Sequence, residues 1–181
     1  NTNSSSCATT GGPGSVLSLY SNYTNLGTFF TVQKDVNYPI SVNIGTCGGN
    51  YSSGTAIYID YNQNGSYGDP GEQVYGTPVG TIGAHIVNGS FTVPSSATLG
   101  VTGMRVINAE GFTASTITPC LSYGYGETED YKVTIAIPVA CSGTPTPGNT
   151  QSSAAAACPV TPFSLTIQNT ATIGSGVSYQ W

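Results

Sequence analysis

Residues 56–72 read AIYIDYNQNGSYGDPGE, a short apolar run that ends in a loop of glycine and small polar residues. Similar β-type runs separated by turn residues continue along the chain, and helical periodicity is almost absent. We therefore expect an all-β protein, a β-sandwich with a jelly-roll-like arrangement. The expected strands are Val16–Tyr20, Thr28–Val32, Ile40–Ile44, Ala56–Asp60, Ala84–Val87, Ser90–Val93, Gly103–Asn108 and Tyr131–Ile137.

The dipeptide Asn88-Gly89 separates two of these strands and predicts a type I′ hairpin turn. Such a turn places four apolar side chains on one face, which we assign to the core: Ala84, Ile86, Phe91 and Val93. His85 and Thr92 then fall on the other face. We expect His85 to be an exposed strand residue and not a ligand or a base.

The chain is unusually poor in charge. Charged residues make up 6% of it, against about 25% in ordinary soluble domains. The formal net charge is −5, with only three basic residues. This balance argues against nucleic acid or an anionic membrane as a partner. No apolar run is long enough to span a bilayer, so we expect no membrane insertion.

The cysteines indicate an oxidising compartment. With this composition they predict a secreted protein, extracellular or at the cell surface, that contains disulfides. The single His85 argues against a zinc site. We interpret Asn1 as a processed end, and the odd cysteine as free, bonded to another chain, or paired beyond Trp181. The five disulfide candidates are Cys7, Cys47, Cys120, Cys141 and Cys158.

Glycosylation sequons of the type N-x-S/T are frequent in the chain. Attached sugar would help to keep a surface with few charges hydrated. The alternative is that the sequons are unused, because they arise by chance in a chain rich in Ser, Thr and Asn. The candidate asparagines are Asn3, Asn22, Asn50, Asn64 and Asn88.

The loop after Ala56–Asp60 offers oxygen ligands at alternate positions. Asp60, Asn62 and Asn64 are followed by a glycine and then by Glu72, which resembles the D-x-[DN]-x-[DN]-G pattern of calcium loops. Calcium takes six to eight such oxygens. The loop departs from an EF-hand because a strand precedes it and Glu72 comes one residue late. We predict a calcium site, with a metal-free hairpin loop as the alternative.

A second acidic cluster occurs in YGYGETEDYKVTI. On the strand that it precedes, Glu127 and Glu129 would point to one side and Asp130 to the other. Carboxylates this close repel one another unless a cation or hydrogen-bond donors lie among them. We expect one or two of them to join Asp60 and Glu72 around one ion. The alternative is a solvated edge with Asp130 capping a turn.

Three motifs together resemble the GEVED domain of secreted bacterial proteins: IDYNQNGSYGDPGE, FTVPSSATLGVTGMRV and GETEDYKV. The resemblance covers residues 7–137. It implies a β-sandwich accessory module of extracellular proteins and not a catalytic domain. Asn64 stands where the family commonly has Asp, which lowers the charge of the loop.

A domain boundary is expected near Pro138. Residues 1–138 would form the sandwich, and 139–181 a linker with two strand-like runs, Phe163–Gln168 and Val177–Trp181. This tail resembles the beginning of an Ig-like repeat, in C-S-G-T-P-T-P-G, F-S-L-T-I and Y-Q-W. It is either a fragment of a longer protein or an extended arm that adds a strand to a neighbouring copy, head to tail, in a homopolymer.

Three classes of function follow. An enzyme is not expected, because a paired nucleophile and base is not evident and the acids fit a structural ion better. We prefer a non-catalytic extracellular structural protein, the subunit of a filament or adhesin, stabilised by calcium and glycosylated. The alternative is a carbohydrate-binding accessory module of a larger secreted hydrolase or protease. Its stacking candidates would be Tyr58, Tyr61, Tyr67, Tyr123 and Tyr125.

Overall fold

The computed structural model describes residues 5–78, 80–138, 150–153 and 165–167. These residues fall into two compact units, Asn1–Pro138 and Val139–Trp181. The first unit consists of β-strands and one short 3-10 helix, η1 (Thr24–Leu26). The prediction of an all-β sandwich is confirmed, and each unit is described by itself below.

The larger of two facing sheets contains seven strands, in the order β1-β9-β8-β4-β5, with β2 also paired to β9 and β6 to β4. β1 and β2 run parallel to β9, whereas β8 runs antiparallel to β9. The smaller sheet pairs β3 with β7. The strands are β1 (Tyr20–Asn22), β2 (Thr28–Gln33), β3 (Asn37–Ile44), β4 (Ser52–Ile59), β5 (Gln73–Gly76), β6 (Thr81–Ile82), β7 (His85–Thr92), β8 (Gly100–Glu110) and β9 (Gly126–Ala136).

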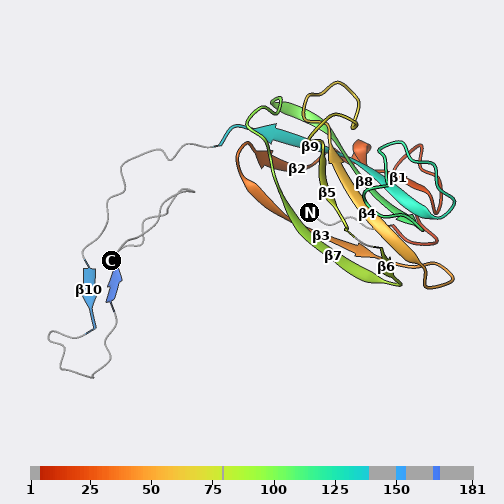
Figure 1. Ribbon diagram of the computed structural model, residues 1–181. Coiled ribbons are helices and arrows are strands. Elements are labelled where there is room, and N and C mark those ends of the chain that lie inside the picture. Colours follow the sequence, from red (N-terminus) through yellow and green to blue (C-terminus); the bar gives the residue numbers. More distant parts are fainter. Residues whose placement is uncertain (1–4, 79, 139–149, 154–164, 168–181) are drawn as a thin grey trace. The chain divides into compact units, whose positions relative to one another are not determined.

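The core lies between the two sheets, which Figure 1 shows as separate layers. Alternate residues of the large sheet, such as Ile57, Val106 and Val133, are buried against Tyr38 and Phe91 of the small sheet. A second apolar cluster lies on the opposite face of the large sheet. That face is covered by loops, and its buried side chains are Ala56, Tyr58, Ile107, Ala109 and Ile117.

The predicted hairpin at Asn88-Gly89 is wrong. Both residues lie inside β7, opposite Ser41 and Ile40 of β3. Without a turn the alternation of β7 continues unbroken, so Val87, Phe91 and Val93 are buried, while Ala84 and Ile86 are exposed. His85 shares the inward side and is half-buried, with its Nδ1 2.7 Å from the carbonyl oxygen of Gly83.

Gly89 allows the ring of Tyr75 to approach the backbone of β7 closely and does not form a turn. A Cβ atom at this position would lie 2.1 Å from Cε2 of Tyr75, and the hydroxyl of Tyr75 donates to the carbonyl oxygen of Asn88 at 3.1 Å. The ring of Tyr75 therefore lies across the backbone of β7. This long-range contact explains why a sequence typical of a turn occurs within a strand.

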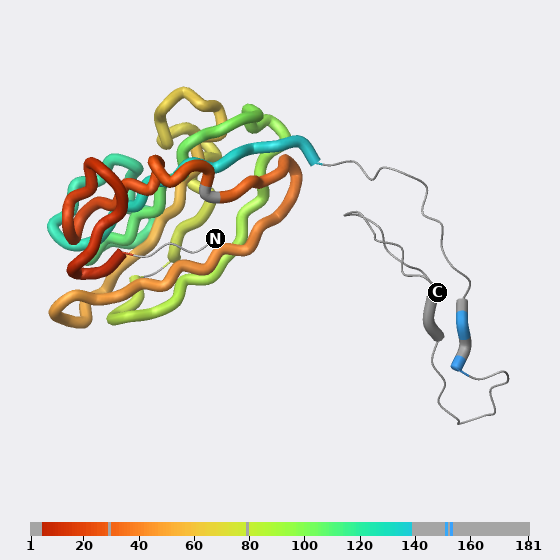
Figure 2. Tube along the Cα trace, turned by 180° about the vertical axis from the view of Figure 1, so that it is seen from behind, coloured from red at the N-terminus to blue at the C-terminus, as the bar shows by residue number. Residues whose placement is uncertain are grey.

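The N-terminal segment covers the edge of β9 in two steps. β1 pairs with Thr128–Asp130 and β2 with Lys132–Ala136, and η1 lies between the two short strands. The expected strand Val16–Tyr20 is wrong: the chain turns there, closed by an isolated bridge between Val16 and Tyr20. Figure 2 shows this N-terminal turn beside the loop that connects β8 to β9.

A disulfide joins Cys7 to Cys47, 40 residues apart, and so ties the N-terminal segment to the β3–β4 connection. Closing a loop of this length stabilises a fold by about 4 kcal/mol in the chain-entropy model. Cys120 is exposed and unpaired among the described residues. Cys141 and Cys158 lie outside them.

The second unit contains one described strand pair, β10 (Thr150–Ser152) with β11 (Leu165–Ile167), which is antiparallel. β11 falls within the expected strand Phe163–Gln168. The rest of that run, and all of Val177–Trp181, lie outside the described residues, so the Ig-like resemblance of the tail stays a prediction.

We predict that Gly89→Ala lowers the free energy of unfolding by about 1–3 kcal/mol, because the methyl group overlaps the ring of Tyr75. The exposed neighbour Asn88 provides the matched control, and Asn88→Ala should change it by less than about 0.5 kcal/mol. Urea denaturation measures both. Adding Tyr75→Ala should remove most of the Gly89→Ala cost. An undiminished cost would instead indicate a backbone requirement for glycine.

Candidate functional site

The carboxylate of Asp60 organises the loop that follows β4. Asp60 is 6% exposed, and its two oxygens accept the backbone N–H groups of Asn64 at 3.2 Å and Gly65 at 2.9 Å. Gly65 has a φ of 81°, and Gln63 also lies in the left-handed region with a φ of 59°. The tight turn that the sequence predicts is therefore built around Asp60.

Asn62, Asn64 and Asp69 converge inside this loop. The amide nitrogens of Asn62 and Asn64 both donate to Oδ2 of Asp69, at 2.9 and 2.7 Å. These hydrogen bonds lower the pKa of the Asp69 carboxyl, with that from Asn62 contributing most. Sequence reasoning missed Asp69 as a site residue, although it was the remaining carboxylate between Asn64 and Glu72.

Glu72 closes the loop from inside. It is 2% exposed, and its carboxylate accepts the backbone N–H of Tyr61 at 3.0 Å and that of Asp69 at 3.3 Å. The structure thus brings together Asp60, Asn62, Asn64 and Glu72, as the spacing predicted. Glu72 is positioned mainly as an internal cap of the loop.

Glu127 lies far from the loop, contrary to expectation, and Asp130 is held by Arg105 instead. Asp60 lies beside Gly103, which is opposite Lys132, whereas Glu127 is opposite Asn108. Glu127 is therefore five residues along β9 from Lys132, the residue level with the loop. Five residues of a strand span roughly 16 Å. The acidic run lies within β9 rather than before it, and its side chains alternate between the two faces as expected.

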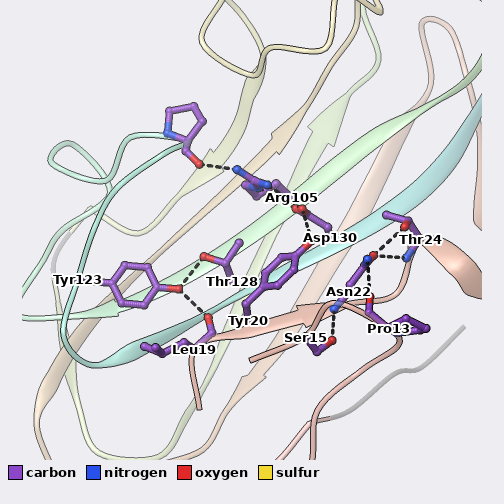
Figure 3. A network of polar contacts seen from close by, with 11 residues as sticks. Pro13, Ser15, Leu19, Tyr20, Asn22, Thr24, Arg105, Tyr123, Thr128 and Asp130 are labelled. Atoms are coloured by element: carbon purple, nitrogen blue, oxygen red, sulfur yellow. Dashed lines mark hydrogen bonds and ion pairs between the residues drawn. The ribbon is translucent and has the colours of Figure 1, made fainter. Parts of the chain in front are cut away.

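Asp130 points to the loop-covered face and pairs with Arg105. The guanidinium holds both carboxylate oxygens, with Nε 2.7 Å from Oδ1 and Nη2 2.6 Å from Oδ2. Tyr20 donates to Oδ2 at 2.9 Å, and Arg105 donates to the carbonyl oxygen of Pro119 at 2.8 Å. Figure 3 shows how this network connects β8, β9, the N-terminal turn and the β8–β9 loop.

The charged and polar groups of this network stabilise one another. The hydrogen bond to Asp130 is the main cause that raises the pKa of Arg105 above its ordinary value. Burial and the bond to Asp130 raise the pKa of Tyr20 to about 12. The ring of Tyr67 lies over the guanidinium, with its centroid 5.1 Å from Cζ of Arg105, and adds a cation–π contact. The raised pKa values of Arg105 and Tyr20 keep the guanidinium charged and the phenol neutral at neutral pH, which suits a structural role.

Most of the tyrosines near the acidic segments are internal. Tyr58 and Tyr61 are buried, and the hydroxyl of Tyr123 contacts Leu19 and Thr128 (Figure 3). Tyr125 is 76% exposed. A flat exposed platform of several rings is thus not formed by these residues, which weakens the support for carbohydrate stacking.

The sequons differ in how free their amides are. The amide nitrogen of Asn22 donates to Pro13 and its oxygen accepts from Thr24 (Figure 3), while Asn64 is bonded to Asp69. Asn50 and Asn88 are exposed, which leaves these two asparagines accessible. Asn3 lies outside the described residues.

The Asp60 loop offers the amide oxygens of Asn62 and Asn64 besides its carboxylates. The described residues contain no group of three or more His, Cys, Asp or Glu side chains placed to share a metal ion. None of their helices has the length and apolarity needed to cross a membrane.

Comparison with known families shows a similarity over part of the chain. A family model of the GEVED domain matches residues 54–134. The matched part begins in β4, includes the Asp60 loop and ends in β9, so it contains both acidic motifs. No curated protein and no solved structure shows significant similarity to the chain.

We predict that Arg105→Met lowers the free energy of unfolding by about 2–4 kcal/mol, because it leaves the Asp130 carboxylate buried without its partner. Lys132, the exposed base two residues from Asp130, provides the control, and Lys132→Met should cost less than about 0.5 kcal/mol. Urea denaturation gives both values.

The double variant Arg105→Met/Asp130→Asn completes a double-mutant cycle. It should lose less stability than Arg105→Met alone, because no unpaired charge remains. If the two single losses simply add, the ion pair does not hold this face together.

Proposed function

We propose that this chain is a non-catalytic extracellular structural protein, the subunit of a surface filament or adhesin, in which calcium stiffens the Asp60 loop. The observation that carries the proposal is how the acids are used. Asp60 and Glu72 bond backbone N–H groups, and Asp130 is held by Arg105. Carboxylates engaged in this way organise loops and strands rather than await a substrate.

The loop has a donor set that suits calcium. Its convergent side chains, Asp60, Asn62, Asn64 and Asp69, offer carboxylate and amide oxygens, which are the ligands that a hard cation prefers. The two amides already face Asp69. Glu72 would keep the loop in position. Calcium bound here would supply structural cross-linking and no redox or nucleophilic chemistry.

An extracellular setting is supported by two observations. The Cys7–Cys47 disulfide is compatible with an oxidising environment, and the matched GEVED family supports an accessory module. Glycans on the exposed Asn50 and Asn88 would add hydration to a surface with few charges.

Assembly of copies is supported by an open sheet edge. Among the described strands, β3 and β7 pair only with each other, and such edges present unpaired N–H and C=O groups that accept a further strand. Pro39 within β3 is typical of an edge strand. The tail carries strand-forming residues, as β10 and β11 show. We propose that a tail strand of one copy adds to the β3–β7 sheet of the next.

We expect calcium to raise the melting temperature and EDTA to reverse the rise, because an ion that binds only the folded state stabilises it by about 2.7 kcal/mol at a hundredfold excess over Kd. Asp69→Asn removes a loop carboxylate and should reduce this gain, as should Asp60→Ala. Asp35→Asn, in the exposed β2–β3 turn, should leave it intact. Equal calcium shifts in all four proteins would refute the loop site.

We expect residues 1–138 to remain folded and monomeric, while the full chain forms filaments in calcium. Negative-stain electron microscopy and light scattering measure the assembly, and circular dichroism verifies that the shortened chain is folded. Filaments formed by the shortened chain would exclude the tail as the joint. A full chain that stays monomeric would leave only an accessory module.

A further inference from the structure

Glu127 and Glu129 form a pair of acids that has no basic partner among the described residues. They follow one another on the inward side of β9, opposite to the side on which Asp130 meets Arg105. The described residues contain a single ion pair, Arg105 with Asp130. The chain has only two other bases, Lys34 and Lys132, and neither is paired with Glu127 or Glu129. A cation between them would relieve their mutual repulsion.

Hydroxyl groups from two further segments surround this pair. Ser5 lies with its Oγ 2.6 Å from Oε2 of Glu127 and 3.4 Å from Oε1 of Glu129. Ser21, which is fully buried in β1, donates to the other oxygen of Glu127 at 2.6 Å. Tyr131 donates to Glu129 at 2.7 Å. The single proton of Ser5 cannot satisfy both carboxylates at once.

Tyr23 is the second and independent observation. Tyr23 is only 5% exposed, and the centroid of its ring lies 5.2 Å from that of Tyr131, on which it stacks. Its buried hydroxyl has no hydrogen-bond partner within 3.5 Å among the described residues. The hydroxyl lies near those of Ser5 and Ser21 and within electrostatic reach of the two carboxylates. A buried hydroxyl without a partner lowers the free energy of unfolding by about 1–3 kcal/mol. A ligand bound to this hydroxyl would remove that cost.

We propose that Glu127, Glu129, Ser5, Ser21 and Tyr23 form a second cation site, separate from the Asp60 loop, that takes calcium. All its donors are oxygens, which favours a hard cation over zinc or copper. Two carboxylates match a divalent charge. The spacing of 2.6–3.4 Å around Ser5 is compatible with oxygens that share one ion at bond lengths of about 2.4 Å.

The site would join three segments that are distant in sequence. Ser5 lies two residues before Cys7, whose disulfide reaches the β3–β4 connection. Ser21 belongs to β1, and the two acids belong to β9. A bound ion would thus fix the N-terminal segment to the strand that leads to the tail. Because this site uses none of the loop residues, it stands or falls independently of the proposed function.

The test is a calcium titration of the full chain by isothermal calorimetry, with native mass spectrometry to count bound ions. Glu129→Gln and Glu127→Gln keep the shape of the side chain and should each lose one calcium relative to the parent. Tyr23→Phe should weaken that ion by about tenfold, the order found for one supporting group around a metal. The control Asp35→Asn should lose none.

Melting curves keep the proposal testable if the variants differ in stability. In EDTA, Glu129→Gln should melt no lower than the parent, because the substitution relieves repulsion between the two acids. Calcium should then raise the melting temperature of Glu129→Gln by less than it raises that of the parent. Asp69→Asn separates the two sites: it should remove the loop ion and leave the second. If the parent and Glu129→Gln bind equal numbers of calcium ions, the acids share a proton instead and the proposal is overturned.

Discussion

Asp130 is a buried carboxylate whose charge is matched by Arg105, and the loop-covered face of the large sheet is arranged around that pair. The guanidinium makes a two-pronged contact with Asp130 and also bonds the carbonyl oxygen of Pro119. The same carboxylate accepts the hydroxyl of Tyr20. One side-chain pair thus fixes the β8–β9 loop and the N-terminal turn to the sheet. With three bases in the whole chain, this use of Arg105 leaves little charge for the other acids.

Scarcity of basic residues explains how the remaining carboxylates are handled. Glu72 and Asp60 are both nearly inaccessible, and each is satisfied by two backbone N–H groups. A carboxylate bonded in this way is stabilised without a salt bridge. Among the described residues, Glu127 and Glu129 have only hydroxyl partners, which donate one proton each. The three acidic clusters therefore differ in how completely they are satisfied, and the least satisfied is the one where a cation would add most.

Local patterns predicted the local features of this fold. Strands with strong β-type character, such as Gly103–Asn108 and Tyr131–Ile137, are present, and the Asp60 loop forms because all its groups lie within a few residues of one another. The hairpin at Asn88-Gly89 failed because the ring of Tyr75, which is remote in sequence, needs a glycine beneath it. The short strands β5 and β6 carry too few residues for a periodic signal.

The distance between the two acidic motifs was beyond sequence reasoning for a similar reason. It depends on the register of β4 with β8 and of β8 with β9, and spacing within one segment does not fix a register between segments. Ser21 and Tyr23 also meet Glu127 and Glu129 only when β1 pairs with β9. A motif in one segment, such as GETED, therefore does not predict which residues of other strands will complete a site with it.

The position of β9 gives these contacts a mechanical meaning if the tail joins neighbouring copies. β9 ends at Ala136 and the first unit at Pro138, so a pull through the tail enters along this strand. Its hydrogen bonds to β8 on one side and to β1 and β2 on the other lie across that direction. They would share the load together rather than open one by one. Asp130 on one face of β9, and Glu127 and Glu129 on the other, fasten the same strand to the N-terminal segment, so the most acidic part of the chain lies where resistance to sliding matters most.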